Sequence, residues 1–121
     1  MCMLKINEKL ITNSIYSTEE QKIGKWINGE SLYRKVLYYS GIIANGSSAG
    51  VGTIDNVDKI INARGFCKSG NTQIPIPESH ISSINSQIEI WFGGNTLTVA
   101  TGSARNISEI RMVVEYTKTT D

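Results

Sequence analysis

The sequence has few of the residues that cross-link a chain, break its regular structure or hold a metal. Its 121 residues include two cysteines, two prolines and one histidine. Cys2 and Cys67 are too few for a disulfide framework, so we expect both thiols to be reduced. His80 would be the single base for any histidine-dependent triad, and no cysteine or paired acid lies at metal-ligand spacing from it. We therefore expect no metal and no cofactor.

A strong net charge and long apolar segments are also missing. Twelve basic and eleven acidic residues give a formal net charge of +1, so no strong field attracts nucleic acid or anionic lipid. No apolar run approaches the length of a membrane-spanning helix, and residues 1–11 lack the basic start and long apolar stretch of a signal peptide. The composition argues against nucleic-acid binding and membrane insertion, and it indicates synthesis in the cytoplasm.

Short apolar segments interrupted by turn residues are what the sequence does contain. Hydrophobic residues make up 40% of the chain, which is enough for one core in one domain. Eleven glycines, together with many asparagines, serines and threonines, interrupt the apolar segments as in strands joined by turns. We predict an all-β fold, an antiparallel β-sandwich of jelly-roll-like type. The helical candidates, residues 17–27 and 108–112, are short.

The clearest strand patterns lie in the second half of the chain. Residues 87–102 (QIEIWFGGNTLTVATG) predict a hairpin with one buried and one polar face. Residues 72–79 contain two prolines, which suits an edge segment. Residues 44–53, rich in glycine and serine, predict a loop. Residues 108–118 predict a strand with four inward side chains: Ile110, Met112, Val114 and Tyr116.

Two earlier segments also alternate, but less cleanly. The strand predicted around residues 32–39 has two part-apolar faces, one of them carrying Tyr33 and Tyr39 and the other Tyr38. We expect another element, or another chain, to cover both faces. Residues 57–66 predict a second strand of this kind, whose two sets of side chains are Val57, Lys59, Ile61 and Ala63 on one face and Ile60, Asn62, Arg64 and Phe66 on the other.

The candidate site residues are aromatic and acidic. Trp91 shares the polar face of the predicted hairpin with Glu89, and an exposed tryptophan of this kind is a typical platform for a sugar ring or a partner surface. The alternative is that Trp91 packs in a subunit contact or under a loop. Trp26 precedes an Asn-Gly turn and is expected to pin that turn to the core. Asp55 and Asp58 lack the pattern of a calcium loop and predict a turn.

Catalytic signals are weak throughout. The segment NGSSAGVG has no Gly-Lys-Ser/Thr after it, so it does not fit a phosphate-binding loop. Scattered acids could serve as a glycosidase pair, but the sequence cannot bring two of them together. We therefore expect a non-enzymatic protein.

Three segments resemble a domain found at the C-terminal end of many phage and prophage tail-fibre or baseplate-associated proteins. Residues 16–37 (YSTEEQKIGKWINGESLYRKVL) resemble its opening, residues 51–65 its second strand segment, and residues 113–121 (VVEYTKTTD) its terminal strand and tail. Residues 30–31 depart from the pattern, which often has proline near this point. The resemblance covers about residues 14–121, which we take as one domain, and residues 1–13 are taken as a leader or stalk remnant.

The resemblance implies a homotrimeric tip domain on a virion tail, which contacts other tail or baseplate proteins and binds bacterial cell-surface carbohydrate without catalysis. It leads us to expect subunit contacts at Tyr33, Tyr39, Lys118 and Asp121, with residues 117–121 completing an edge strand near the three-fold axis. Two other functions stay open. One is a trimerisation or assembly module that touches no receptor, and the other is a polysaccharide hydrolase.

Overall fold

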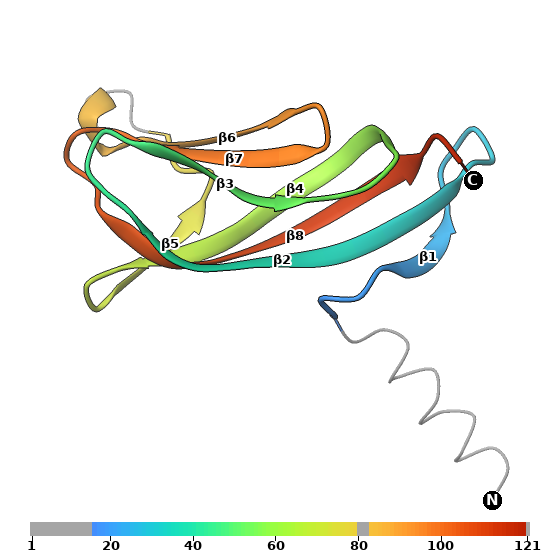
Figure 1. Cartoon of the computed structure of the whole chain (residues 1–121), viewed down its shortest axis with the longest axis horizontal. Helices are drawn as coiled ribbons and strands as arrows, with labels where there is room; N and C mark the ends of the chain where they lie inside the picture. Colours follow the sequence, from blue (N-terminus) through green and yellow to red (C-terminus); the bar gives the residue numbers. More distant parts are fainter. Residues whose placement is uncertain (1–15, 80–82, 121) are drawn as a thin grey trace, which may run out of the picture.

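The chain folds into two antiparallel β-sheets, as the sequence predicts. The computed structural model describes residues 16–79 and 83–120, and Figure 1 shows the two sheets lying one above the other. The five-stranded sheet has the order β1-β2-β8-β4-β5 and the three-stranded sheet the order β3-β7-β6. The strands are β1 (Gln21–Lys25), β2 (Ser31–Ile43), β3 (Ser48–Thr53), β4 (Val57–Ser69), β5 (Thr72–Ile76), β6 (Ile88–Gly93), β7 (Thr96–Thr101) and β8 (Ile107–Lys118), with a short 3-10 turn, η1 (Ile84–Ser86), before β6.

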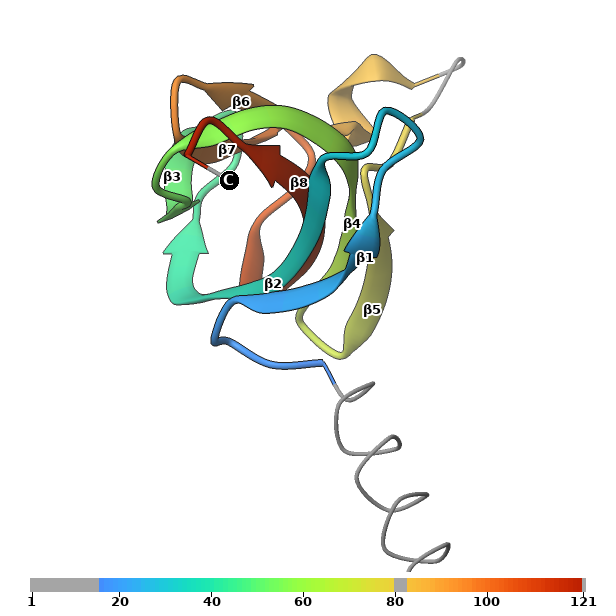
Figure 2. The same ribbon diagram turned by 90° about the vertical axis from the view of Figure 1, so that its right-hand side faces the viewer.

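A single core fills the space between the sheets. The view along the long axis shows the strands curling around this interior (Figure 2). The four side chains predicted to point inward from the last strand are all 0% exposed, which confirms that prediction. They pack with buried residues from both sheets: Leu37, Ile43, Val51, Ile54, Cys67, Ile74, Ile76, Ile88, Leu97, Val99 and Ile107.

The predicted hairpin and edge segment are also confirmed. β6 and β7 pair in register, with Ile90 opposite Val99, and Gly94 takes a positive φ of 62° in the turn between them. β5, which contains Pro75, is the outer strand of the five-stranded sheet, where a residue without an N–H is tolerated. Both helical candidates are instead strand: residues 17–27 contain β1, and residues 108–112 lie in β8.

The loop predicted over residues 44–53 is wrong for its second half. Residues 48–53 form β3 and pair with β7. Val51 is 6% exposed and Ile54 1%, so these two side chains anchor the segment in the core. A Cβ on Gly52 would lie 3.0 Å from the side chain of Leu37. Glycine is therefore used here for close packing rather than for flexibility.

Strict alternation also fails in β4. The pairing of β4 with β8 shifts between Ile60 and Asn62, so that Ile60 lies opposite Tyr116 and packs against the core. Asn62 lies opposite Glu115 on the outer side. The irregularity thus separates Ile60 from the outer residues with which the sequence groups it.

The end of the chain is not an edge strand. Residues 117 and 118 belong to β8, which lies between β2 and β4 in the sheet. Thr117 is fully buried, and its Oγ1 accepts a hydrogen bond of 3.2 Å from the Lys59 amide. The Thr119 amide donates to the Asn56 carbonyl at 2.8 Å. Thr117 and Lys118 are therefore part of a central strand, Thr119 and Thr120 form an exposed turn after it, and Asp121 lies outside the described residues.

Candidate functional site

Trp91 and Glu89 both project from the outer side of β6. Ile88, two residues before Ile90, is 1% exposed, and Ile90 and Phe92 pack against the core. Because successive side chains of a strand point to opposite sides, Glu89 and Trp91 face away from the core. Trp91 is 46% exposed. The predicted placement of this pair on the polar face of the hairpin is confirmed.

Two shallow hollows meet at Glu89, and we call the surface that they form with Trp91 the Trp91 face. One hollow, of about 440 Å³, lies between β6 and the segment after β5 and is lined by residues 77–79 and 87–91. The other, of about 280 Å³, lies between η1 and the end of β7; its lining is Ile84, Asn85, Gln87, Glu89, Ala100, Thr101 and Gly102. The Trp91 face thus offers one large ring beside carboxylate and amide groups.

Arg105 joins two segments that border the Trp91 face, namely η1 and the segment after β5. Its Nη2 lies 2.7 Å from Glu78 Oε1, and its Nε donates to the Ser86 carbonyl at 3.0 Å. Both partners in the ion pair are about four-fifths buried, so solvent screens their attraction less than it would at an open surface. Arg105 therefore connects η1 to the segment after β5. These two segments border the larger and the smaller hollow.

A glycine lets η1 approach β7. The Gly102 amide donates to the Gln87 carbonyl at 2.8 Å, and the Ala104 amide donates to the Asn85 carbonyl at 2.9 Å. A Cβ on Gly102 would lie 2.3 Å from that same Asn85 oxygen. No side chain fits at this position without moving η1, so Gly102 sets the depth of the smaller hollow.

The free edge of β6 lies beside Trp91. β6 pairs with β7 on one side, and on the other side the pairing described by the structure is the bridge between Glu78 and Ile88. Because backbone groups alternate in direction along an antiparallel strand, those of Ile90 and Phe92 face this free edge. Ile90 also lines the larger hollow, so its backbone donor and acceptor lie beside that hollow.

Three of the residues expected at subunit contacts, Tyr33, Tyr39 and Lys118, have partners within their own chain. The Tyr33 ring stacks on the Tyr116 ring, with centroids 6.0 Å apart, and the Lys118 amine lies 5.0 Å from the Tyr33 ring centre. Tyr39 packs against the core, over the position of Gly41. A role of these residues between subunits stays a prediction.

Glu20 accepts hydrogen bonds from two side chains at this end of β8. The Tyr116 hydroxyl donates to Glu20 Oε1 at 2.6 Å, and the Lys118 amine donates to Oε2 at 2.9 Å. Desolvation raises the pKa of Glu20, but the hydrogen bonds from Tyr116 and Lys118 outweigh it, so the pKa lies below its ordinary value. The hydrogen bond to Glu20 raises the pKa of Lys118. Both groups are therefore charged at neutral pH.

Sequence reasoning missed a row of three side chains on the outer side of the five-stranded sheet. Tyr38, Arg111 and Phe66 lie opposite one another on β2, β8 and β4. Tyr38 is 46% exposed and Phe66 39%. The alternation of each strand already turned these residues outward, but only the register between strands brings them into one row. We call them the arginine–aromatic row.

The remaining candidates have structural roles or lie outside the described residues. Asp55 and Asn56 form the predicted turn, and Asp58 pairs with Lys59 at 2.8 Å. Within residues 16–79 and 83–120 no group of three metal-ligating side chains is found. Trp26 is only half-buried and is not among the side chains packed on the core; its backbone closes the β1–β2 turn through a 2.8 Å bond from its amide to Glu30.

Cys67 is a free, fully buried thiol. Burial, with a smaller contribution from Glu78, raises the pKa of Cys67 to about 11, so the reactive thiolate is scarce at neutral pH. Cys2 and His80 lie outside the described residues.

The fold and these surfaces define an antiparallel all-β sandwich with an exposed tryptophan face. No family model, curated protein or solved structure matches the chain. Among the described residues, no helix has the length and apolar character needed to cross a membrane. Kinship with tail-fibre tip domains therefore stays a prediction from the resemblance of the three segments.

Proposed function

We propose that the chain is a non-catalytic carbohydrate-binding domain, the tip of a phage or prophage tail fibre, and that it attaches to bacterial cell-surface glycan through the Trp91 face. The observation that carries this proposal is the exposed Trp91 ring, which lines the larger hollow, with Glu89 beside it where the two hollows meet. A flat indole stacks on the apolar face of a sugar ring, and neighbouring carboxylate and amide groups bind its hydroxyls.

The shape of the face favours binding over turnover. Both hollows are shallow and open, which suits a glycan chain lying across the surface. A glycosidase needs two carboxyl groups placed on either side of the bond that is cut. The acids here are Glu89 and Glu78, and Glu78 forms an ion pair with Arg105 at 2.7 Å. Glu78 is thus engaged in a contact that joins two segments of the chain, and this favours a binder over a hydrolase.

A single open site of this kind binds weakly, and a trimer would compensate for this. Three copies on one fibre tip that engage one cell surface raise the overall affinity through effective concentration. The trimer is an expectation from the resemblance, and it is tested by the mass of the full chain in solution.

The decisive experiment compares two tryptophans. The full chain is titrated with a panel of neutral bacterial surface glycans, and Trp91→Ala is compared with Trp26→Ala, which removes an indole from the β1–β2 turn. We expect Trp91→Ala to weaken binding by about tenfold or more and to leave the fold intact, whereas Trp26→Ala leaves binding unchanged. Trp91→Phe should retain part of the affinity.

Three results would contradict the proposal. If the wild-type chain binds no glycan but forms a stable trimer, it is an assembly module. If Trp91→Ala dissociates the trimer, Trp91 belongs to a subunit contact. Turnover of a purified polymer that is abolished by Glu78→Gln or Glu89→Gln would establish the hydrolase instead.

A further inference from the structure

The arginine–aromatic row holds one guanidinium group between two exposed rings. The Arg111 Cζ lies 4.5 Å from the centre of the Tyr38 ring and 5.8 Å from the centre of the Phe66 ring. The three side chains come from neighbouring strands β2, β8 and β4, which run side by side in the five-stranded sheet (Figure 1). The rings therefore restrict Arg111 before any ligand arrives, which lowers the entropy lost on binding.

A second guanidinium group lies next to this row. Arg64 is exposed and sits opposite Val113, which places it diagonally across from Arg111 on the same outer side of the sheet. Diagonal neighbours on paired strands lie within reach of long side chains. Arg64 and Arg111 can thus contact the same small group.

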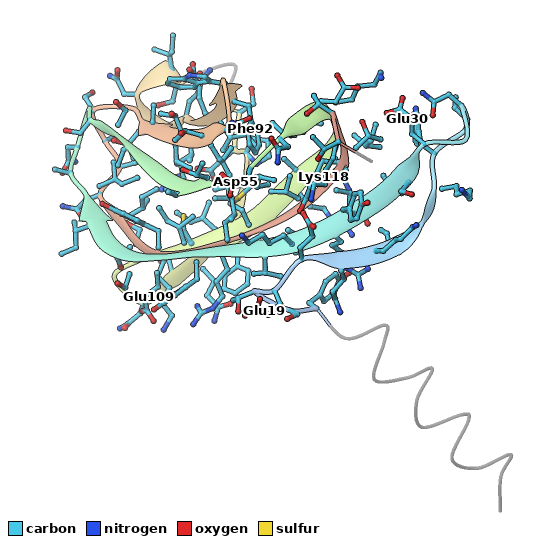
Figure 3. All side chains as sticks on the ribbon, turned by 45° about the vertical axis from the view of Figure 1, so that its right-hand side comes forward. Glu19, Glu30, Asp55, Phe92, Glu109 and Lys118 are labelled. Atoms are coloured by element: carbon cyan, nitrogen blue, oxygen red, sulfur yellow. The ribbon has the colours of Figure 1, made fainter. Side chains whose placement is uncertain are left out.

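Two of the acids on this side of the sheet, Glu109 and Glu115, already have polar partners. Glu109, which Figure 3 shows at the lower surface, pairs with Lys68 at 3.7 Å. Glu115 accepts a hydrogen bond from Asn62 at 3.4 Å and lies opposite Arg34. Within residues 16–79 and 83–120 no carboxylate forms an ion pair with Arg64 or Arg111. Two positive charges therefore remain locally uncompensated in a chain whose net charge is only +1.

These groups fit an oxyanion better than a nucleic-acid base. Guanidinium N–H groups bind carboxylate and phosphate through paired, charge-assisted hydrogen bonds. Bases stack on free aromatic faces, but Arg111 already covers one face of Tyr38 and approaches Phe66. The low net charge also provides no long-range attraction for a nucleic-acid strand.

We propose that Arg111 and Arg64, supported by Tyr38 and Phe66, form a second binding site that takes the carboxylate or phosphate group of an acidic glycan. The anion chemistry follows from the two arginines. The choice of a glycan as its carrier rests on the proposed function. This site lies on the sheet opposite the one that carries Trp91, so the two sites can be tested separately.

The test is a calorimetric titration of the full chain with four polymers. An oligogalacturonate supplies carboxylate, a poly(glycerol phosphate) supplies phosphate, dextran is the neutral control, and an oligothymidylate represents nucleic acid. We expect one or both of the acidic non-nucleic polymers to bind, and added salt to weaken that binding. The polymer that binds identifies the oxyanion.

Matched variants locate the site. Arg64→Ala and Arg111→Ala should each weaken binding of the acidic polymer by about tenfold, as expected for the loss of charge-assisted hydrogen bonds. Arg111→Lys keeps the charge but loses the planar fork, so it should restore only part of the affinity. Lys22→Ala removes the same charge from an exposed position of β1 and should change nothing.

Several outcomes would overturn the proposal. If Lys22→Ala weakens acidic-polymer binding as much as the arginine variants do, the effect comes from net charge alone. If the oligothymidylate binds more tightly than the acidic polymers, this face binds nucleic acid. If Arg111→Ala dissociates an oligomer, the face is a subunit contact. Failure of all four polymers to bind would also exclude it. Trp91→Ala should leave acidic-polymer binding intact, so failure here and failure of the Trp91 face remain distinguishable.

Discussion

Both outer faces of the sandwich expose aromatic side chains, but the charged residues beside those side chains differ between the two faces. On the three-stranded sheet, Trp91 lines the larger hollow, and Glu89 beside it lines both hollows. On the five-stranded sheet, Tyr38 and Phe66 flank Arg111. The first face offers acceptors and a ring for neutral hydroxyl-bearing groups, and the second offers cations. Glu89 and Trp91 come from one strand, whereas Tyr38, Arg111 and Phe66 come from three, so only the second face depends on the register between strands.

The first prediction breaks the arginine–aromatic row. In Gly65→Ala the new Cβ would lie 1.8 Å from the Arg111 carbonyl oxygen, which is backbone and cannot rotate away. β4 would have to separate from β8, and Phe66 would leave Arg111. We expect a loss of about 4 kcal/mol or more in the free energy of unfolding, measured by urea denaturation.

A glycine of the other sheet provides the control. Nothing lies within 4 Å of the Cβ position of Gly93, at the end of β6. Gly93→Ala should therefore change the stability by no more than about 0.5 kcal/mol. If Gly65→Ala were as harmless as Gly93→Ala, the close pairing of β4 with β8 under the row would be refuted.

The second prediction disturbs the Trp91 face alone. Gly102→Ala places a Cβ 2.3 Å from the Asn85 carbonyl oxygen and should push η1 outward. Because η1 is a short surface turn, we expect a loss of only about 1–3 kcal/mol. Neutral-glycan binding should weaken, while acidic-polymer binding should not. Parallel loss of both activities would show that the two faces are not independent.

What the sequence predicts well is the identity and direction of the clearly alternating strands. The hairpin of residues 87–102, the inward residues of β8 and the outward position of Trp91 follow from period-2 alternation alone. β3 was missed because Gly50 and Gly52 look like loop residues, although Gly52 allows close packing against Leu37 of the other sheet and Gly50 against Thr96 of the neighbouring strand. Ile60 was misplaced because alternation cannot show the irregularity that shifts the pairing of β4.

Sequence patterns predict the part of the candidate sites that lies on a single strand. Glu89 and Trp91 lie on one strand, so their spacing places them together. Tyr38, Phe66 and Arg111 lie on three strands, and their contact depends on a register that sequence patterns do not fix. Sequence patterns also could not pair Lys118 with Glu20, which lies 98 residues earlier in the chain.

The third prediction tests whether the contacts of Glu20 at the end of β8 stabilise the folded chain. Glu20→Gln keeps the shape of the side chain but removes the charge that binds Tyr116 and Lys118. Since Glu20 is 34% exposed and Lys118 19%, solvent reduces the effect, and we expect a loss of about 1 kcal/mol at neutral pH.

The stability difference between Glu20→Gln and the wild type should depend on pH. The folded pKa of Glu20 is lowered, so its stabilisation is present above the ordinary carboxyl pKa of 4.5 and is lost as the pH falls through the lowered value. Glu20→Gln should therefore lose stability at neutral pH but match the wild type in strong acid. An equal deficit at both pH values would mean that packing, not charge, is responsible.

The last prediction separates binding from folding in the arginine–aromatic row. Cys67 follows Phe66 on β4 and is fully buried with a pKa raised to about 11, so a thiol reagent reaches it only when β4 opens. In a Cys2→Ser background, Cys67 should stay unlabelled in the folded protein. If the row serves a ligand, Arg111→Ala should leave the labelling rate within about fivefold of the parent, since an exposed cation–π contact contributes only about 0.5–1 kcal/mol. A much faster reaction would show that Arg111 instead clamps β4 onto β8, and the arginine–aromatic row would then be a structural feature of the sheet.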